Sequence, residues 1–223
     1  MKKKGRQAHT PAHLCSTVLG SQLVYHQRSI REAEEGTVTS GTFLTSPKVQ
    51  AALYTAQQAL DDALINAVQN RRIPKTIARL VAQGAYINAL RDGLSPLLIA
   101  VINRDVETLT TLLTLGADVH TTDPYGNTAL HLIALKPTAK NITQAEILLL
   151  AGAAVNAQNH LGQTPLHLCG AKTKLQKTFC QLLLKHHAQL DIVDIKGNAP
   201  LAKLPESVRA ELMRYALFSF FGR

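Results

Sequence analysis

Apolar residues recur along the middle of the chain in blocks that follow glycines at nearly constant spacing. Four such glycines each precede an apolar run, and 33, 36 and 35 residues separate them: Gly93, Gly126, Gly162 and Gly197. A second series of turns alternates with the first, at residues 81–89, 114–122, 150–158 and 185–193. Each unit therefore predicts a turn, a short helix, a leucine-rich second helix and a closing turn.

The residues at the ends of these blocks support helices. Thr or Ser precedes Pro at 164–165 and 95–96, which is typical of an N-cap followed by the first helical turn. Gly116 and Gly152 follow leucine runs, where a left-handed C-cap is expected. One helix pair cannot bury its apolar face alone, so we expect neighbouring units to stack into a continuous core.

The repeated motifs resemble the ankyrin repeat, whose units open with G-x-T-P-L-H-x-A and close with G-A-D-x-N. Residues 164–167 (TPLH) match the opening in full, residues 128–131 (TALH) lack the proline, and residues 95–98 (SPLL) lack the histidine. The resemblance covers about residues 61–204. It implies an all-α repeat solenoid of helix-turn-helix units with β-hairpin finger loops. It also implies a protein-binding function, with His131 and His167 in a structural role.

The domain organisation follows from the repeat. We expect a basic, mostly disordered arm at 1–45, and an ankyrin-repeat domain at 46–204 that opens with a helix at Pro47. A capping helix and aromatic tail then occupy 205–223. The expected repeats are 61–89, 90–122, 123–158 and 159–194, with a degenerate last unit from 195. Two insertions, at 136–141 and 171–177, are interpreted as Lys-bearing loops between the helices.

Composition fits a helical stack, because apolar residues make up 46% of the chain, aromatic residues only 4%, and Trp is absent. No apolar run approaches the roughly 18 residues that cross a bilayer, so we expect a soluble, cytoplasmic monomer. Cys15, Cys169 and Cys180 form no CxxC pair, which favours a reducing compartment. The net charge of +9 is concentrated at the two ends. Charge at chain ends is more typical of solvated tails than of a nucleic-acid surface. The alternative function is a nucleic-acid-associated regulator that uses the basic N-terminal arm.

Candidate chemistry is sparse. No phosphate loop or hydrolase signature occurs, and a metal site at His131 or His167 would need further ligands, so we expect no enzyme, cofactor or metal. Cys180 is predicted to be a small core residue, and His186-His187 a solvated helix cap. Phe218 is expected to cover the end of the stack. A C-terminal export signal is the alternative, since small ankyrin proteins of this style resemble effectors that intracellular bacteria inject into host cells.

The predicted function is an adaptor or inhibitor that binds another protein through the finger loops and the inner helices. Each finger offers one large apolar side chain, although Leu94 and Leu161 could instead pack against the next finger. The predicted fingertip residues are Arg91, Asp92, Leu94, Tyr125, Asn127, His160, Leu161, Gln163, Ile195, Lys196 and Asn198. The predicted inner-helix residues are Ile102, Asn103, Leu135, Lys136 and Lys172.

Overall fold

A computed structural model describes residues 47–71, 74–170 and 172–221 of the chain. The arm predicted at residues 1–45 lies outside the described residues. The described helices are α2 (Pro47–Gln69), α3 (Pro74–Ala82), α4 (Pro96–Ile102), α5 (Val106–Thr114), α6 (Ala129–Leu135), α7 (Ala139–Leu150), α8 (Pro165–Leu168), α9 (Lys174–Lys185) and α10 (Glu206–Phe221).

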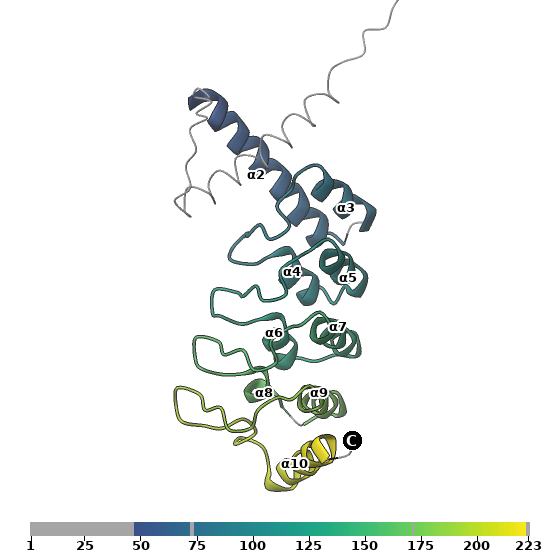
Figure 1. Ribbon diagram of the computed structural model, residues 1–223, viewed down its shortest axis with the longest axis vertical. Helices are drawn as coiled ribbons and strands as arrows, with labels where there is room; N and C mark the ends of the chain where they lie inside the picture. The colour runs from purple at the N-terminus through teal and green to yellow at the C-terminus, as the bar shows by residue number, and fades with distance from the viewer. Residues whose placement is uncertain (1–46, 72–73, 171, 222–223) are drawn as a thin grey trace, which may run out of the picture.

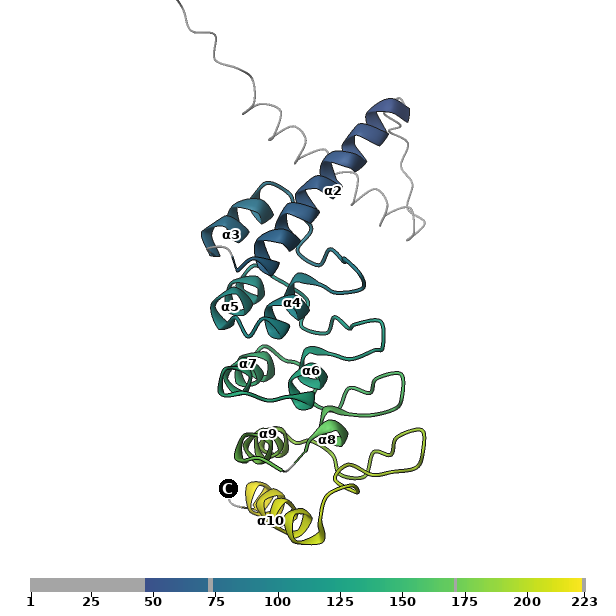
Figure 2. The same cartoon turned by 180° about the vertical axis from the view of Figure 1, so that it is seen from behind.

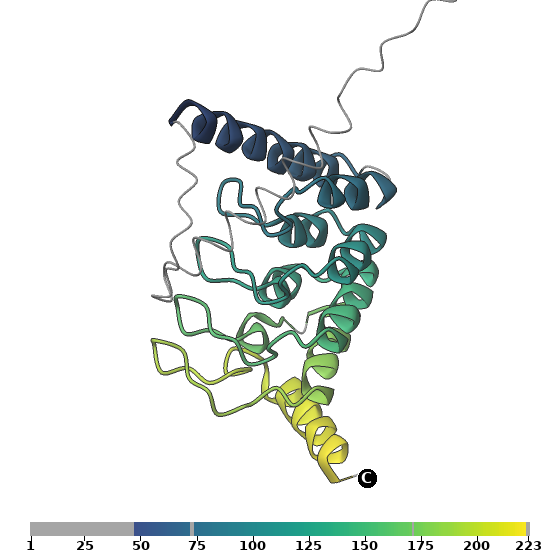
Figure 3. The ribbon, with the colours of Figure 1, turned by 45° about the horizontal axis from the view of Figure 1, so that its top comes forward.

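The helices form two parallel columns (Figures 1 and 2). Helices α2, α4, α6 and α8 contact one another in order as the first column, and α3, α5, α7 and α9 do so as the second. Extended loops project to one side of the stack, and the view in Figure 3 shows them as a series of parallel fingers. We call them fingers one to four, at residues 85–94, 117–127, 153–163 and 188–198. This architecture confirms the all-α repeat solenoid predicted from the sequence.

The fingers contain turns and isolated bridges instead of continuous strands. In the described part of the chain, antiparallel bridges pair Arg91 with Leu94 and Thr122 with Thr128. No helix in the same residues is both long and apolar enough to cross a membrane.

Side-chain caps fix where the helices begin. Ser95 Oγ accepts a hydrogen bond from Leu98 N at 3.3 Å, directly before the proline that opens α4. Asp105 Oδ1 accepts from Thr108 N at 3.1 Å to open α5. Such caps satisfy amide groups that have no partner inside the helix.

The core is built from Leu, Ile and Ala, as the composition predicts. One fully buried leucine from each of α4, α5, α6, α7 and α8 shows how it runs through the stack: Leu97, Leu112, Leu130, Leu148 and Leu166. Cys180 is also fully buried, which confirms its predicted core position. The core is therefore continuous from one repeat to the next, and no unit buries its apolar face alone.

The ends of the second helices follow the predicted turn chemistry. Gly116 and Gly152 have φ of 88° and 89°, and His187 takes the corresponding place with φ of 65°. A charged histidine at this helix end would be stabilised by the helix dipole, but the environment of His186 disfavours its charged form. Burial, followed by the charge of Lys185, lowers the pKa of that side chain below its ordinary value.

The sequence predicted a loop at each of the two insertions, and this prediction is wrong for the second half of each. Helix α7 begins at Ala139 and helix α9 at Lys174, so the second half of each inserted segment is helical. Thr138 and Thr173 act as the N-caps, with hydrogen bonds from Asn141 N and Gln176 N. Both helices contain 12 residues, against nine in α5, so the extra residues add about one turn to the second column.

The C-terminal unit departs from the repeat, as expected. Turns replace its first helix around Leu201, whose φ is 66°. Helix α10 then packs against α9 through buried Leu212 and Ala216. The side chain of Phe218, which was predicted to cover this end, lies outside the described residues.

Candidate functional site

An acidic or amide side chain shapes the turn of each of the last three fingers. In finger two, Asp123 Oδ1 accepts hydrogen bonds from Tyr125 N and Asn127 N, both at 2.8 Å. Gly126 N then donates to Asp123 O at 2.9 Å, which closes the turn. Asn159 and Asp194 make the equivalent bonds in fingers three and four. Asp and Asn favour such turns because their side chains accept from the backbone two residues later.

Neighbouring fingers are joined through their backbones. His160 N donates to Tyr125 O at 3.0 Å, and Ile195 N donates to Leu161 O at 3.1 Å. The side chains of Asn159 and Asn127 are also joined, at 2.9 Å. Fingers two, three and four therefore form one hydrogen-bonded surface, which holds the tips in place without a bound partner.

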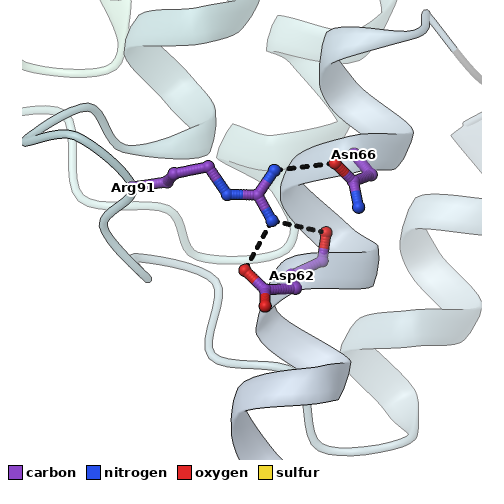
Figure 4. Close-up of polar contacts among 3 residues, drawn as sticks. All are labelled: Asp62, Asn66 and Arg91. Carbon is purple, nitrogen blue, oxygen red and sulfur yellow. Dashed lines mark hydrogen bonds and ion pairs between the residues drawn. The ribbon is translucent and has the colours of Figure 1, made fainter.

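Finger one is held differently, because Leu90 stands where the other fingers have Asp or Asn. Arg91 and Leu94 exchange backbone hydrogen bonds at 3.1 and 2.9 Å. The guanidinium of Arg91 then reaches helix α2, where it donates to Asn66 Oδ1 at 2.7 Å and forms an ion pair with Asp62 (Figure 4). Arg91 was predicted as a partner contact, and in this structure it links finger one to α2.

The two histidines of the repeated motif connect each first helix to the following finger. His131 Nδ1 accepts from Thr128 N at 3.1 Å, and Nε2 lies 2.8 Å from Gln163 O. His167 repeats this arrangement with Thr164 N at 3.0 Å and Asn198 O at 3.1 Å. Burial lowers the pKa of His131, which favours the neutral ring that this geometry requires. These contacts agree with the structural role that the resemblance implied.

Three of the four predicted apolar fingertip side chains are exposed. Tyr125 exposes 73% of its surface, Ile195 67% and Leu161 51%. Leu94 is half-buried and packs against the core, so it is less exposed than its predicted fingertip role requires. Leu161 keeps about half of its surface exposed, as a fingertip contact requires. Tyr125, Leu161 and Ile195 therefore form a row of exposed apolar side chains on fingers two to four.

The polar fingertip residues divide into two groups. Asp92, His160 and Lys196 are exposed. Asn127, Gln163 and Asn198 are half-buried, and the side-chain amides of Asn127 and Asn198 donate to Asp123 and Asp194 within their own turns. The sequence placed all six at exposed positions, so it missed that the side chains of Asn127 and Asn198 bond within their own fingers. The sequence signal for these turns is an Asp or Asn three residues before each of Gly126, Gly162 and Gly197.

The predicted inner-helix residues lie at the far ends of the first helices. Ile102 and Leu135 are the last residues of α4 and α6 and expose 52% and 57% of their surfaces. Lys136 and Lys172 are exposed but lie in the loops after α6 and α8, so their placement on helices was wrong.

Asn103 was also predicted to be a contact residue on an inner helix, but it follows α4 and bonds to its neighbour in the stack. Its side chain donates to Val68 O at 3.2 Å and to Gln69 O at 3.3 Å, at the end of α2. It therefore ties the second unit to the first, and its amide is not available to a partner.

The remaining candidate groups do not converge. No group of three or more His, Cys, Asp or Glu side chains with metal-site geometry occurs among the described residues. Cys169 and Cys180 are free and buried, and burial raises the pKa of the Cys169 thiol, which keeps it protonated.

Comparisons with known proteins agree with this geometry. The family model described as ankyrin repeat matches residues 92–124 and again residues 125–160. No curated protein matches the chain.

Proposed function

The chain is an ankyrin-repeat protein, and we propose that it binds a partner protein through Tyr125, Leu161 and Ile195 on fingers two to four. Ankyrin repeats are generally protein-interaction modules. The observation that carries the proposal is the row of exposed apolar side chains on a hydrogen-bonded frame. Exposed apolar groups with polar neighbours are typical of a partner surface.

The rigidity of the frame supports a binding role. Binding normally costs free energy because loops and side chains become ordered. In fingers two to four the backbone is already fixed by the bonds from Asp123, Asn159 and Asp194. Little ordering remains to be done, so the apolar contacts can contribute more of their free energy to affinity. Tyr125 is the strongest candidate for an anchor because tyrosine is enriched at interface hot spots.

The proposed action is occupation of the partner's surface, either as an adaptor or as an inhibitor, with no chemical step. Asp92, His160 and Lys196 are exposed beside the apolar row. They would form the polar rim of the interface and set its specificity.

Affinity capture from a cell extract tests the proposal. The intact chain is compared with a Tyr125→Ala, Leu161→Ala double variant, and retained proteins are identified by mass spectrometry. A Tyr54→Ala, Leu150→Ala double variant is the matched control, because these side chains lie on helices α2 and α7 and expose 65% and 82% of their surfaces. We expect a protein that the intact chain and the control retain and the fingertip variant loses.

Two outcomes contradict the proposal. In one, all three chains retain the same protein equally. In the other, only nucleic acid is retained, it is removed by salt, and binding disappears when residues 1–45 are deleted. The hypothesis of an effector acting in the cytoplasm of a host cell stays a separate prediction. Its test is whether the last thirty residues direct the translocation of a reporter.

A further inference from the structure

Seven exposed basic residues line the end of the helix pairs that lies opposite the fingers. One follows the first helix of each unit: Arg71, Arg104, Lys136 and Lys172. Three more lie in the first turn of α3, α7 and α9: Lys75, Lys140 and Lys174. Because each first helix starts at a finger and runs away from it, these loops lie at the other end of the stack. We call these seven residues the interhelical edge.

Successive loops of this edge lie side by side. Arg71 donates to Asn103 O at 2.7 Å, which joins the first loop to the second. Gln144 of α7 donates to Ala100 O at 3.1 Å, which joins the second unit to the third. Packed helices lie about 8–10 Å apart, so cations recur along the edge at about 10 Å intervals.

Helix stability does not account for these residues. Arg71 and Arg104 have φ of 49° and 56°, a left-handed conformation in which glycine or asparagine is favoured. Lys75, Lys140 and Lys174 lie in first turns, where the helix dipole favours an acidic side chain, and α3, α7 and α9 have none there. Arg71 gains the bond to Asn103 O in return, but no contact within the described residues compensates the departure from local preference at the other four positions, and a functional role is expected at such positions.

The cations of the edge have no counter-ions within the protein that the structure describes. The salt bridges in these residues join Arg91 to Asp62, Lys177 to Glu211 and Arg209 to Glu206, and none involves the edge. Acidic groups near the edge are Asp105 and Glu107, in the loop before α5 and its first turn, and Glu211, which pairs with Lys177 one turn after Lys174. The fingers carry a net negative charge, because they contain five aspartates and only two Lys or Arg residues, Arg91 and Lys196. The stack is therefore basic along one end of its helix pairs and acidic along the other.

Apolar side chains adjoin the row of cations. Ile102 and Leu135 end α4 and α6, directly before the loops that hold Arg104 and Lys136, and more than half of each side chain is exposed. A partner of this edge must therefore offer apolar groups as well as negative charge.

We propose that the interhelical edge binds an acidic polypeptide segment that lies extended along the stack, with apolar side chains between its carboxylates. An extended chain rises about 3.3 Å per residue, so an acidic residue at every third position matches cations about 10 Å apart. Nucleic acid fits less well, because duplex DNA carries a charge about every 1.7 Å and offers no groups for Ile102 and Leu135. The proposal goes beyond fingertip binding and can fail independently of it.

A synthetic peptide of about 15 residues, with Glu at every third position and Val and Ser between, spans the edge and serves as the probe. Binding is measured by fluorescence anisotropy. The edge variant combines Arg104→Gln, Lys136→Gln, Lys140→Gln and Lys172→Gln. The control combines Lys185→Gln, Lys196→Gln, Lys203→Gln and Arg214→Gln, four exposed cations outside the edge. Each variant lowers the net charge of +9 by four, and urea unfolding verifies that both remain folded.

We expect the edge variant to weaken peptide binding at least about tenfold and the control less than about twofold, because close charge pairs contribute more than overall charge. An Ile102→Ser, Leu135→Ser variant should weaken binding as well, and the Tyr125→Ala, Leu161→Ala variant should not. Equal losses in edge variant and control overturn the proposal, as does the absence of peptide binding. Tighter binding of a single-stranded oligonucleotide of equal charge, lost in the edge variant, also overturns it.

Discussion

Replacing His131 by leucine removes a link between helix α6 and finger three while keeping a side chain of similar size in a fully buried site. The substitution leaves Thr128 N without its acceptor and takes one of two donors from Gln163 O, which still accepts from Asn159 N. An unsatisfied buried amide costs about 1–3 kcal/mol, and a lost hydrogen bond about 0.5–1.5 kcal/mol. The expected fall in the free energy of unfolding is therefore about 2–4 kcal/mol.

His167→Leu is the matched comparison, because His167 makes the same pair of bonds with Thr164 N and Asn198 O. His167 is only half-buried, so water can replace part of what is lost. Its expected cost is about 1–2 kcal/mol. Equilibrium urea unfolding at pH 7.5, followed by circular dichroism, measures both. A change below about 0.5 kcal/mol for His131→Leu would refute the structural role of His131. A larger change for His167→Leu than for His131→Leu would contradict the argument that burial sets the cost.

Three further predictions concern pH, the finger turns and the core. Burial lowers the pKa of His131 and of His186 below 6.5. Stability should therefore fall as the pH drops through 6.5, and urea midpoints at pH 7.5 and 5.5 should show a smaller fall in His131→Leu. Gly126→Ala should lower the thermal midpoint more than Gly152→Ala. Both glycines have positive φ, but only at 126 would a Cβ meet another residue, His160 N at 3.0 Å. Leu148→Ala should cost about 2.5–5 kcal/mol in urea unfolding, against under about 0.5 kcal/mol for the 82% exposed Leu150.

The repeat itself could be predicted from the sequence because its local signals agree with one another. The glycine spacing, the Thr-Pro-Leu-His motif and the leucine runs all indicate stacked helix pairs, and the structure places them so. The Asp and Asn residues of the finger turns were equally local, and Asp123 could have been recognised from its distance to Gly126.

Other features depend on contacts between units and could not be found in this way. The bond from Asn103 to the end of α2 joins residues 34 and 35 positions apart, and the first unit lacks the repeat motif that would have set its register. The insertion at 136–141 was interpreted as a loop because this unit is longer than its neighbour between the two helices, although Thr138 is a good N-cap for a longer helix.

A photo-crosslinking amino acid at position 125 tests the central claim most directly, because it reports contact at the fingertip itself. The same group at position 150 is the control, since Leu150 is at least as exposed and lies outside the fingers. After irradiation in a cell extract, we predict a discrete protein adduct from position 125 and none of that mass from position 150. Equal labelling from both positions, or no adduct at position 125 from a chain that still retains its partner, would contradict fingertip binding.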